Sequence, residues 1–490
     1  MSAGIKSNGA PDLAMLRMDD GAVAAAMFTT NLFAAAPVQI SRDHLHNSRG
    51  HANVLILNSG CANAATGPHG YADAQTIGDS VAQECGCAPD AVLMNSTGII
   101  GKRLPLANIA KCIAALSQSC VDGNAEPFAR AIMTTDTRLK MSTRLVAVAP
   151  HGAGNASVQN VKNTTNPAQI RVTGVAKGAG MIHPNMATMI AVITTDAALE
   201  PHELDAMLRV AVEQSFHRIS IDGDTSTNDS VFTFATAQRG VAADHGELQR
   251  AFCEVARDLA RMIVCDGEGF TRAFEVRVRG AASAADALDV ARTAATSLLV
   301  RCAITGGDPN WGRLLAAAGR SGAKVDPERV SLRVGDVVLF QDGQPAITKK
   351  EIAAAEFAKS NVIVEFNLGF GEHEDFFISS GMTEEYVKLN SEYSTRRLYK
   401  TTALLASHFA ISHGTHDHEF HAVAVVLLHR IQPEAIESSY AISNIHLDVR
   451  NFISSYASFP IRSTGARNGW RYRRHEVGWH TNRRASHQTS

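Results

Sequence analysis

The sequence predicts an α/β fold, because segments with helical spacing alternate with short apolar runs that are typical of buried strands. The 490 residues exceed the size of one hydrophobic core, so two domains are the starting expectation. Hydrophobic residues make up 45% of the chain and charged residues 19%, as in ordinary globular proteins. The helices and strands interleave without a GxGxxG string, so a dinucleotide-binding fold is not indicated.

The N-terminal half contains four runs that predict strands and three stretches that predict helices. The first strand ends at Ser59-Gly60, a pair that favours a turn. Residues 134–137, Thr-Thr-Asp-Thr, are interpreted as a polar stop after a helix. The strands are expected at 52–58, 91–94, 144–149 and 170–176, and the helices at 71–84, 106–116 and 127–133.

The C-terminal half continues this alternation. Two alternating runs around Gly335-Asp336 predict a hairpin over 330–340, and residues 304–313 predict a tight turn and a helix start. An apolar, β-branched run after residue 188 predicts a buried strand. Further strands are expected at 218–221 and 361–367, and helices at 202–216, 248–264 and 285–300.

Charge and composition exclude several classes of protein. The formal net charge of −2 argues against a nucleic-acid partner, which usually needs a strongly basic surface. No apolar run approaches the roughly 18–20 residues of a membrane helix, and the N-terminus lacks the apolar core of a secretory signal. The eight cysteines are scattered without CxxC pairs, so neither a zinc site nor a disulfide framework is indicated. We therefore expect a cytoplasmic protein with no nucleic-acid and no membrane partner.

The main candidate site is KGAGMIHPNMATMIAV, residues 177–192, in which a glycine-rich turn leads to Thr188 at the start of an apolar run. The Thr188 hydroxyl could attack the Ala187 carbonyl and shift the acyl group from nitrogen to oxygen, after which water would cut the chain. Thr188 would then carry a nucleophilic hydroxyl and a free α-amine, whose ordinary pKa of about 7.7–8.0 suits a base. The alternative is an ordinary strand start, since Ala-Thr before an apolar run is common.

A second candidate is the turn NSTGIIG, residues 95–101. A strand that ends in a glycine-bearing turn can point backbone N–H groups and a hydroxyl, here from Thr97 and Gly98, at a developing oxyanion. Each well-placed donor lowers a reaction barrier by roughly 3–4 kcal/mol. The alternative is a plain turn between a strand and a helix.

Other ionisable side chains are weaker candidates for ligands. Glu268, between two glycines at a helix end, is either a solvated loop acid or a contact for a cationic substrate. The loop DGDTSTND, residues 222–229, invites a calcium interpretation but has Thr227 where glycine is needed and Thr233 where glutamate is needed. No metal site is expected, although the C-terminal region holds a histidine cluster at His413, His416, His418 and His421.

The string KGAGMIHPNMATM closely resembles the self-cleavage motif of the ornithine acetyltransferase family, also called the bifunctional glutamate N-acetyltransferase family of arginine biosynthesis. The chain departs from the family at Phe270 and Arg272, where alanine and lysine are usual, and family members usually carry a further segment before AGIK. Further strings over residues 2–395 resemble the same family: AGIK, TTNLFAAAPVQISRDHL, NSGCANAATGPHGYADA, DGEG, DPNWGR and TEEYVKLNSEYST.

The resemblance implies a mixed-sheet α/β sandwich of the kind shared with self-processing aminopeptidases, with a second, smaller C-terminal domain. It implies an α chain of residues 1–187 and a β chain of residues 188–395, which assemble as a heterotetramer of two α and two β chains. Residues 396–490 lie beyond the family pattern and hold 10 of the 20 histidines and 12 basic against 6 acidic residues. We interpret this region as an atypical extension with little order.

The implied reaction moves acetyl from N2-acetyl-L-ornithine to L-glutamate by a ping-pong route through acetylated Thr188, with no cofactor. Some members also take acetyl from acetyl-CoA, which would be a second donor substrate. In the family pattern, Thr97 and Gly98 are the oxyanion positions. The implied substrate-binding residues are Thr173, Lys177, Thr188, Glu268, Asn390 and Thr395.

Two other functions stay open at this point. An N-terminal-nucleophile amidase on the same fold would hand the acyl group to water and would release ornithine without glutamate. An uncleaved, inactive binding protein would keep Ala187 joined to Thr188. The products of the reaction and the intact mass of the chain distinguish these alternatives.

Overall fold

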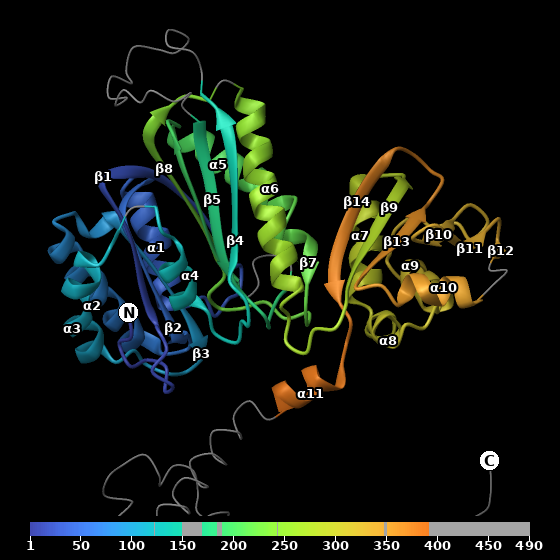
Figure 1. The fold of residues 1–490 in the computed structure, drawn as a ribbon, viewed down its shortest axis with the longest axis horizontal. Coiled ribbons are helices and arrows are strands. Elements are labelled where there is room, and N and C mark those ends of the chain that lie inside the picture. The colour runs from blue at the N-terminus through green and yellow to red at the C-terminus, as the bar shows by residue number, and fades with distance from the viewer. Residues whose placement is uncertain (122, 149–168, 184–188, 243, 347–349, 392–490) are drawn as a thin grey trace, which may run out of the picture. The chain divides into compact units, whose positions relative to one another are not determined.

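The computed structural model describes residues 1–121, 123–148, 169–183, 189–242, 244–346 and 350–391. These residues form a mixed α/β fold with two seven-stranded sheets, so the predicted fold class is confirmed (Figure 1). Residues 396–490, interpreted above as an atypical extension, lie outside the described residues. None of the described helices combines the length and the apolar character that a membrane crossing requires.

The first sheet has the strand order β3-β2-β1-β8-β6-β5-β4. Its long strand β1 (Leu13–Phe28) pairs with β2 near its start and with β8 near its end, with a register shift between Arg17 and Ala22. An irregularity of this kind bends a strand, so β1 connects two halves of the sheet. The other strands are β2 (His51–Cys61), β3 (Val92–Ile99), β4 (Lys140–Ala147), β5 (Gln169–Lys177), β6 (Ile190–Ala197) and β8 (Ser230–Gly240).

Helices cover the two halves of the first sheet from opposite sides. One buried apolar cluster joins β1, β2 and β3 to α2 and α3, and another joins β4, β5, β6 and β8 to α5 and α6 (Figure 1). A third cluster brings Leu55, Leu57 and Leu93 together with Val175, Val192 and Phe232, one set from each half. The sheet therefore packs on itself as a sandwich. The helices are α1 (Ala36–Asn47), α2 (Gly67–Cys85), α3 (Leu106–Gln118), α4 (Glu126–Ile132), α5 (Pro201–Glu213) and α6 (His245–Val264).

The second sheet has the order β12-β11-β10-β13-β9-β14-β7. Phe274, Val276 and Phe366 lie in its core, and α7 packs against β9 and β14 (Figure 1). Its strands are β7 (Ile219–Ser220), β9 (Ala273–Ala281), β10 (Ser331–Val334), β11 (Val337–Gln341), β12 (Gln344–Pro345), β13 (Asn361–Asn367) and β14 (His373–Ser380). The remaining helices are α7 (Ala284–Thr296), α8 (Leu298–Gly306), α9 (Trp311–Gly319), α10 (Lys350–Phe357) and α11 (Glu384–Ser391), with short 3-10 helices at Pro89–Ala91 and Phe216–Arg218.

Two predicted elements differ from the structure. The helix expected over 285–300 is two helices, α7 and α8, because Ser297 has an extended backbone conformation. The second strand, expected over 91–94, continues as β3 to Ile99, so Thr97 and Gly98 lie on a strand rather than in a turn.

The first sheet contains strands from both sides of the predicted cut. Strand β5 ends before residue 188, and its antiparallel neighbour β6 begins after it. Likewise β1 pairs with β8. The expected α chain (1–187) and β chain (188–395) therefore share one hydrogen-bonded sheet, although Ala187 and Thr188 themselves lie outside the described residues.

Candidate active site

Lys177 ends strand β5 in a fully enclosed position. Its side chain is 2% exposed, and its Nζ donates a hydrogen bond to Thr97 Oγ1 on β3 at 3.3 Å. In the β5–β6 ladder Lys177 lies opposite Ile190, two residues after the predicted nucleophile. The structure thus brings two of the predicted site residues, Lys177 and Thr97, together beside the start of β6.

A network of buried charges surrounds this lysine. Lys140 Nζ donates to Asp136 Oδ1 at 2.7 Å and to Asp266 Oδ2 at 2.5 Å. The N–H of Gly178 also donates to Asp136, at 2.6 Å. From the sequence, Asp136 is interpreted only as part of a polar stop, and neither Lys140 nor Asp266 is a predicted site residue.

Charge–charge interactions in this network shift the titration of its members. Burial by itself raises the pKa of Asp136, but the charges of Lys177 and Lys140 outweigh it and hold the pKa at about 2. Burial lowers the pKa of Lys177, against the opposing effect of Asp136. Perturbed groups enclosed beside a strand end are common where chemistry occurs.

Gly98 occupies a position that only glycine fits. Its φ is +134°, and a Cβ there would lie 2.4 Å from the carbonyl carbon of Gly60 on β2. Because the two backbones are this close, no side chain fits between them, and the end of β3 can lie directly against β2. Thr97, beside it, is buried. The Thr97 hydroxyl thus lies against Lys177 Nζ, where the end of β3 meets the end of β5.

Glu268 and Asn390 lie together against the glycine-rich turn. The Glu268 N–H donates to the Ala179 carbonyl at 2.7 Å, and a Cβ at Gly180 would lie 2.8 Å from Glu268 Oε2. Asn390, on α11, donates from Nδ2 to Glu268 Oε2 at 2.9 Å. The arrangement can receive a cationic group, because the carboxylate has no basic side chain among its hydrogen-bond partners in the described part of the chain.

Thr173 does not join this group. It lies four residues before Lys177 on β5, a separation of about 13 Å along an extended strand. Its hydroxyl is 3.1 Å from Thr143 Oγ1, and its carbonyl accepts a bond from Thr194. Its role in substrate binding stays a prediction, as do those of Ala187, Thr188 and Thr395, which lie outside the described residues.

The loop with the calcium-like acidic pattern contributes polar contacts instead. Asn228 donates from its side chain to the carbonyls of Ala62 and Ser96, each at 2.7 Å. Asp229 is fully buried and accepts the N–H of Met189 at 2.9 Å. Burial raises the pKa of Asp229 well above its usual range. Across the described ranges, no three His, Cys, Asp or Glu side chains form a metal-binding group.

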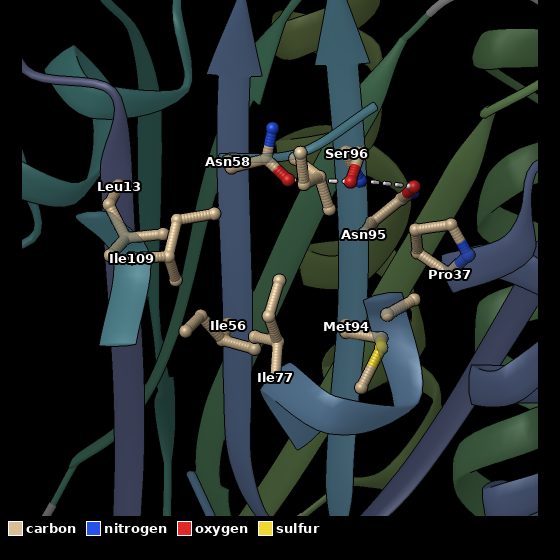
Figure 2. A pocket seen from close by; sticks show the side chains of 11 residues that line it. Leu13, Pro37, Ile56, Asn58, Ile77, Met94, Asn95, Ser96 and Ile109 are labelled. Atoms are coloured by element: carbon tan, nitrogen blue, oxygen red, sulfur yellow. Dashed lines mark hydrogen bonds between the residues drawn. The ribbon is translucent and has the colours of Figure 1, made fainter. Parts of the chain in front are cut away.

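Figure 2 shows a small cavity beside the middle of β3, where Met94, Asn95 and Ser96 of that strand line it. Its polar wall consists of Asn58, Asn95 and Ser96, with a hydrogen bond of 2.5 Å from Ser96 Oγ to Asn58 Oδ1. The cavity has a volume of about 20 Å³, enough for one water molecule. It is therefore a packing gap and not a binding site for an amino acid.

Comparison with known proteins gives a family for this arrangement. The model of the ArgJ family matches residues 1–395. The arginine biosynthesis bifunctional protein ArgJ of Thermosynechococcus vestitus is 40% identical over 418 residues, covering 81% of this chain and 95% of that protein. The protein of the same name from Rhodopirellula baltica is 40% identical over 406 residues, covering 81% of this chain and 94% of that protein.

A solved structure of ornithine acetyltransferase from Mycobacterium tuberculosis, complexed with ornithine, is 32% identical in sequence. The match covers 38% of this chain and 88% of that chain, with a TM-score of 0.30. Family membership therefore rests on the family model and on the sequence relatives.

Proposed function

The chain belongs to the ArgJ family and is an acetyltransferase of arginine biosynthesis, and on this premise we propose that it cuts itself before Thr188 and transfers acetyl from N2-acetyl-L-ornithine to L-glutamate. The observation that carries the proposal is the contact between Lys177 and Thr97. It brings a buried cation and a hydroxyl beside the start of β6, two residues after the predicted nucleophile.

In the first half of the reaction, Thr188 Oγ attacks the acetyl carbonyl of N2-acetyl-L-ornithine. The α-amine of Thr188 accepts the hydroxyl proton and passes it to the departing ornithine nitrogen, so the carbon–nitrogen bond breaks as the ester forms. Thr97 and Gly98 stabilise the negative oxygen of the tetrahedral intermediate. In the second half, the amine of glutamate attacks the acetyl ester and regenerates the Thr188 hydroxyl.

Substrate binding follows from the charges around the site. Glu268, held by Asn390, suits the side-chain ammonium of ornithine, and Lys177 suits a substrate carboxylate. Asn390 and Thr395 close the pocket in this proposal. Thr173 is retained as a substrate-binding residue only on the family resemblance.

Three finer features belong to the same proposal. Acetyl-CoA serves as an additional acetyl donor for glutamate, with no resident cofactor. The α and β chains stay associated through the sheet that the two segments share, and on the family resemblance two copies of each form a heterotetramer. The enzyme acts in the cytoplasm.

The intact mass of the denatured protein tests self-cleavage. Dividing the 52.3 kDa chain in the proportion of 187 to 303 residues gives pieces of roughly 20 and 32 kDa. Wild type should show both pieces, the larger beginning at Thr188, whereas Thr188→Ala should remain one chain. A single uncut wild-type chain would contradict the mechanism.

Product analysis tests the transfer. The protein is incubated with N2-acetyl-L-ornithine, with and without L-glutamate, and with Thr188→Ala as the matched control. With glutamate we expect N-acetylglutamate and ornithine to form over many turnovers, whereas without glutamate the release of ornithine should stop after about one molecule per Thr188. Release of acetate and ornithine at the same rate without glutamate would instead identify an amidase.

A further inference from the structure

The glycine-rich turn before the predicted cut is bound by Asp222. The consecutive N–H groups of Met181 and Ile182 both donate to its carboxylate, that of Ile182 at 2.8 Å. Met181 has a φ of +56°, a conformation that non-glycine residues seldom adopt. Backbone with a left-handed residue turns successive N–H groups toward one point, where an anion binds. The carboxylate of Asp222 therefore stabilises this bend.

The segment that carries Asp222, the loop of residues 220–230, also binds the carbonyl group of Ile182. The Ile182 carbonyl accepts bonds from the N–H of Ile221 at 2.8 Å and from Ser220 Oγ at 3.0 Å. The ring of His183 lies with Nδ1 3.1 Å from Ser220 Oγ. The backbone is thus fixed up to the last described residue before 184–188, the segment that contains the predicted scissile bond.

The far end of the loop holds the other side of that segment. Met189 donates its N–H to Asp229 Oδ1 at 2.9 Å, and the Met189 carbonyl accepts the N–H of Ser230 at 3.1 Å. The second oxygen of Asp229 accepts the N–H of Ser226 at 3.1 Å. Since Asp229 is fully buried, water does not compete for these bonds.

The loop is itself anchored on both sides. Near its far end, Asn228 binds the carbonyl of Ser96, next to Thr97. At its near end, the buried Arg301 interacts with the Asp222 carboxylate by its charge, and burial together with the charge of Asp222 raises the pKa of the Tyr386 hydroxyl. One loop therefore connects both flanks of the cleavage segment to the predicted oxyanion position.

We propose that residues 220–230 form a two-ended clamp on the cleavage segment, and that Asp222 and Asp229 are positioning residues for self-cleavage. The proposal deepens the proposed function and rests on it, because it assumes a cut between Ala187 and Thr188. Attack of a hydroxyl on the preceding carbonyl needs the reacting atoms in one orientation, and fixing both flanks reduces the conformations in which they miss each other. Neither aspartate takes part in the bond changes.

The test is a time course of cleavage during cell-free synthesis of the full chain. We expect Asp222→Ala and Asp229→Asn to slow the appearance of the two pieces by about tenfold or more, the effect of about 1.4 kcal/mol on a barrier. Asp222→Asn, which keeps one acceptor oxygen, should fall between Asp222→Ala and wild type. Asp224→Asn is the matched control, because Asp224 is an exposed carboxylate of the same loop.

A second measurement separates positioning from general destabilisation. Thermal unfolding should show that the variants are folded. The cut fraction of Asp222→Asn should transfer acetyl from N2-acetyl-L-ornithine with the wild-type KM. Ser220→Ala removes the hydroxyl that donates to the Ile182 carbonyl, so it should slow cleavage by about twofold to fivefold even if the aspartate variants fail to fold.

Wild-type cleavage rates in both aspartate variants, or equal slowing in Asp224→Asn, would overturn the clamp. Wild type that cuts itself but transfers no acetyl would contradict the proposed function and leave the clamp standing. Wild type that never cuts itself would overturn both.

Discussion

The two sheets differ in how they treat buried charge. The core cluster of the second sheet consists of Ala, Val, Leu, Ile and Phe side chains, and the buried Glu275 and Arg301 beside it pair with exposed arginines and with a backbone carbonyl. The first sheet instead encloses Lys140, Lys177 and Asp136 between its strands and loops. Removing charges from water is costly, and a buried ion network often stabilises a protein no better than apolar packing would. We infer that the second sheet mainly supplies stability, whereas the buried charges of the first sheet serve the candidate site.

Substitution of Phe366 should have the largest effect and should act on stability alone. Phe366 is fully buried on β13 in the second sheet, so Phe366→Ala leaves a cavity and should lower the free energy of unfolding by about 3–5 kcal/mol. Denaturant unfolding gives this value, with Phe366→Leu as the milder control. The protein that remains folded should retain its kcat. A large loss of kcat in the folded variant would contradict the inference that the second sheet contributes stability alone.

Substitution of Lys177 should show the reverse pattern. Lys177→Met keeps a similar volume but removes the buried cation beside Thr97, while Asp136 keeps its bonds to Lys140 and Gly178. We expect kcat/KM for acetyl transfer to fall about 10²–10³-fold, because the substrate carboxylate loses its buried charged partner. Lys102→Met, at an exposed position, is the control.

The melting temperature of Lys177→Met should change by only a few degrees, and its intact mass reports whether it is cut. Activity within about threefold of wild type would remove Lys177 from the site.

Acid should lower the free energy of unfolding by protonating Asp136, which belongs to the charge network of the first sheet. Burial opposes ionisation of this carboxyl, but Lys177 and Lys140 hold its pKa at about 2, below the ordinary value of 3.8. A lowered pKa contributes stability that is fully present above pH 3.8 and is lost as the pH falls through about 2. The contribution is about 2 kcal/mol, because a tenfold difference in proton affinity between the folded and unfolded protein corresponds to about 1.4 kcal/mol.

The unfolding free energies of wild type and Asp136→Asn should therefore converge by about this amount between pH 5 and pH 2. The same substitution at the exposed Asp336, in the second region, is the control. A difference that stays constant with pH would show that Asp136 does not supply this stability.

Much of the fold was accessible from the sequence, because period and turn residues are local properties. The predicted runs at 52–58 and 170–176 are β2 and β5, and the helix predicted at 248–264 is α6. Strand β1 escaped prediction, since its register shift places Asp19, Asp20 and Gly21 in the middle of the strand. The break at Ser297 also lacks a local cause, because no Gly or Pro marks it.

The candidate site divides in the same way. Lys177, Thr97 and Gly98 were predicted from the family resemblance, and in the structure Lys177 Nζ lies 3.3 Å from the hydroxyl of Thr97, the neighbour of Gly98. Asp136 and Asp229 were not, because their roles depend on partners 41 and 40 residues away, Lys177 and Met189. In the sequence, a carboxylate in a threonine-rich loop resembles an exposed residue, because its burial depends on distant segments.

The pairing of β5 with β6, and of β1 with β8, has a consequence for the cut protein. A cut between these partners leaves two polypeptides whose native state is a single complex with one shared core. Refolding then becomes an encounter between two molecules and obeys mass action. The uncut Thr188→Ala chain can refold alone at any dilution, whereas the cut protein loses its folded state as it is diluted. The proposed self-cleavage would therefore replace an intramolecular folding equilibrium with one that depends on protein concentration.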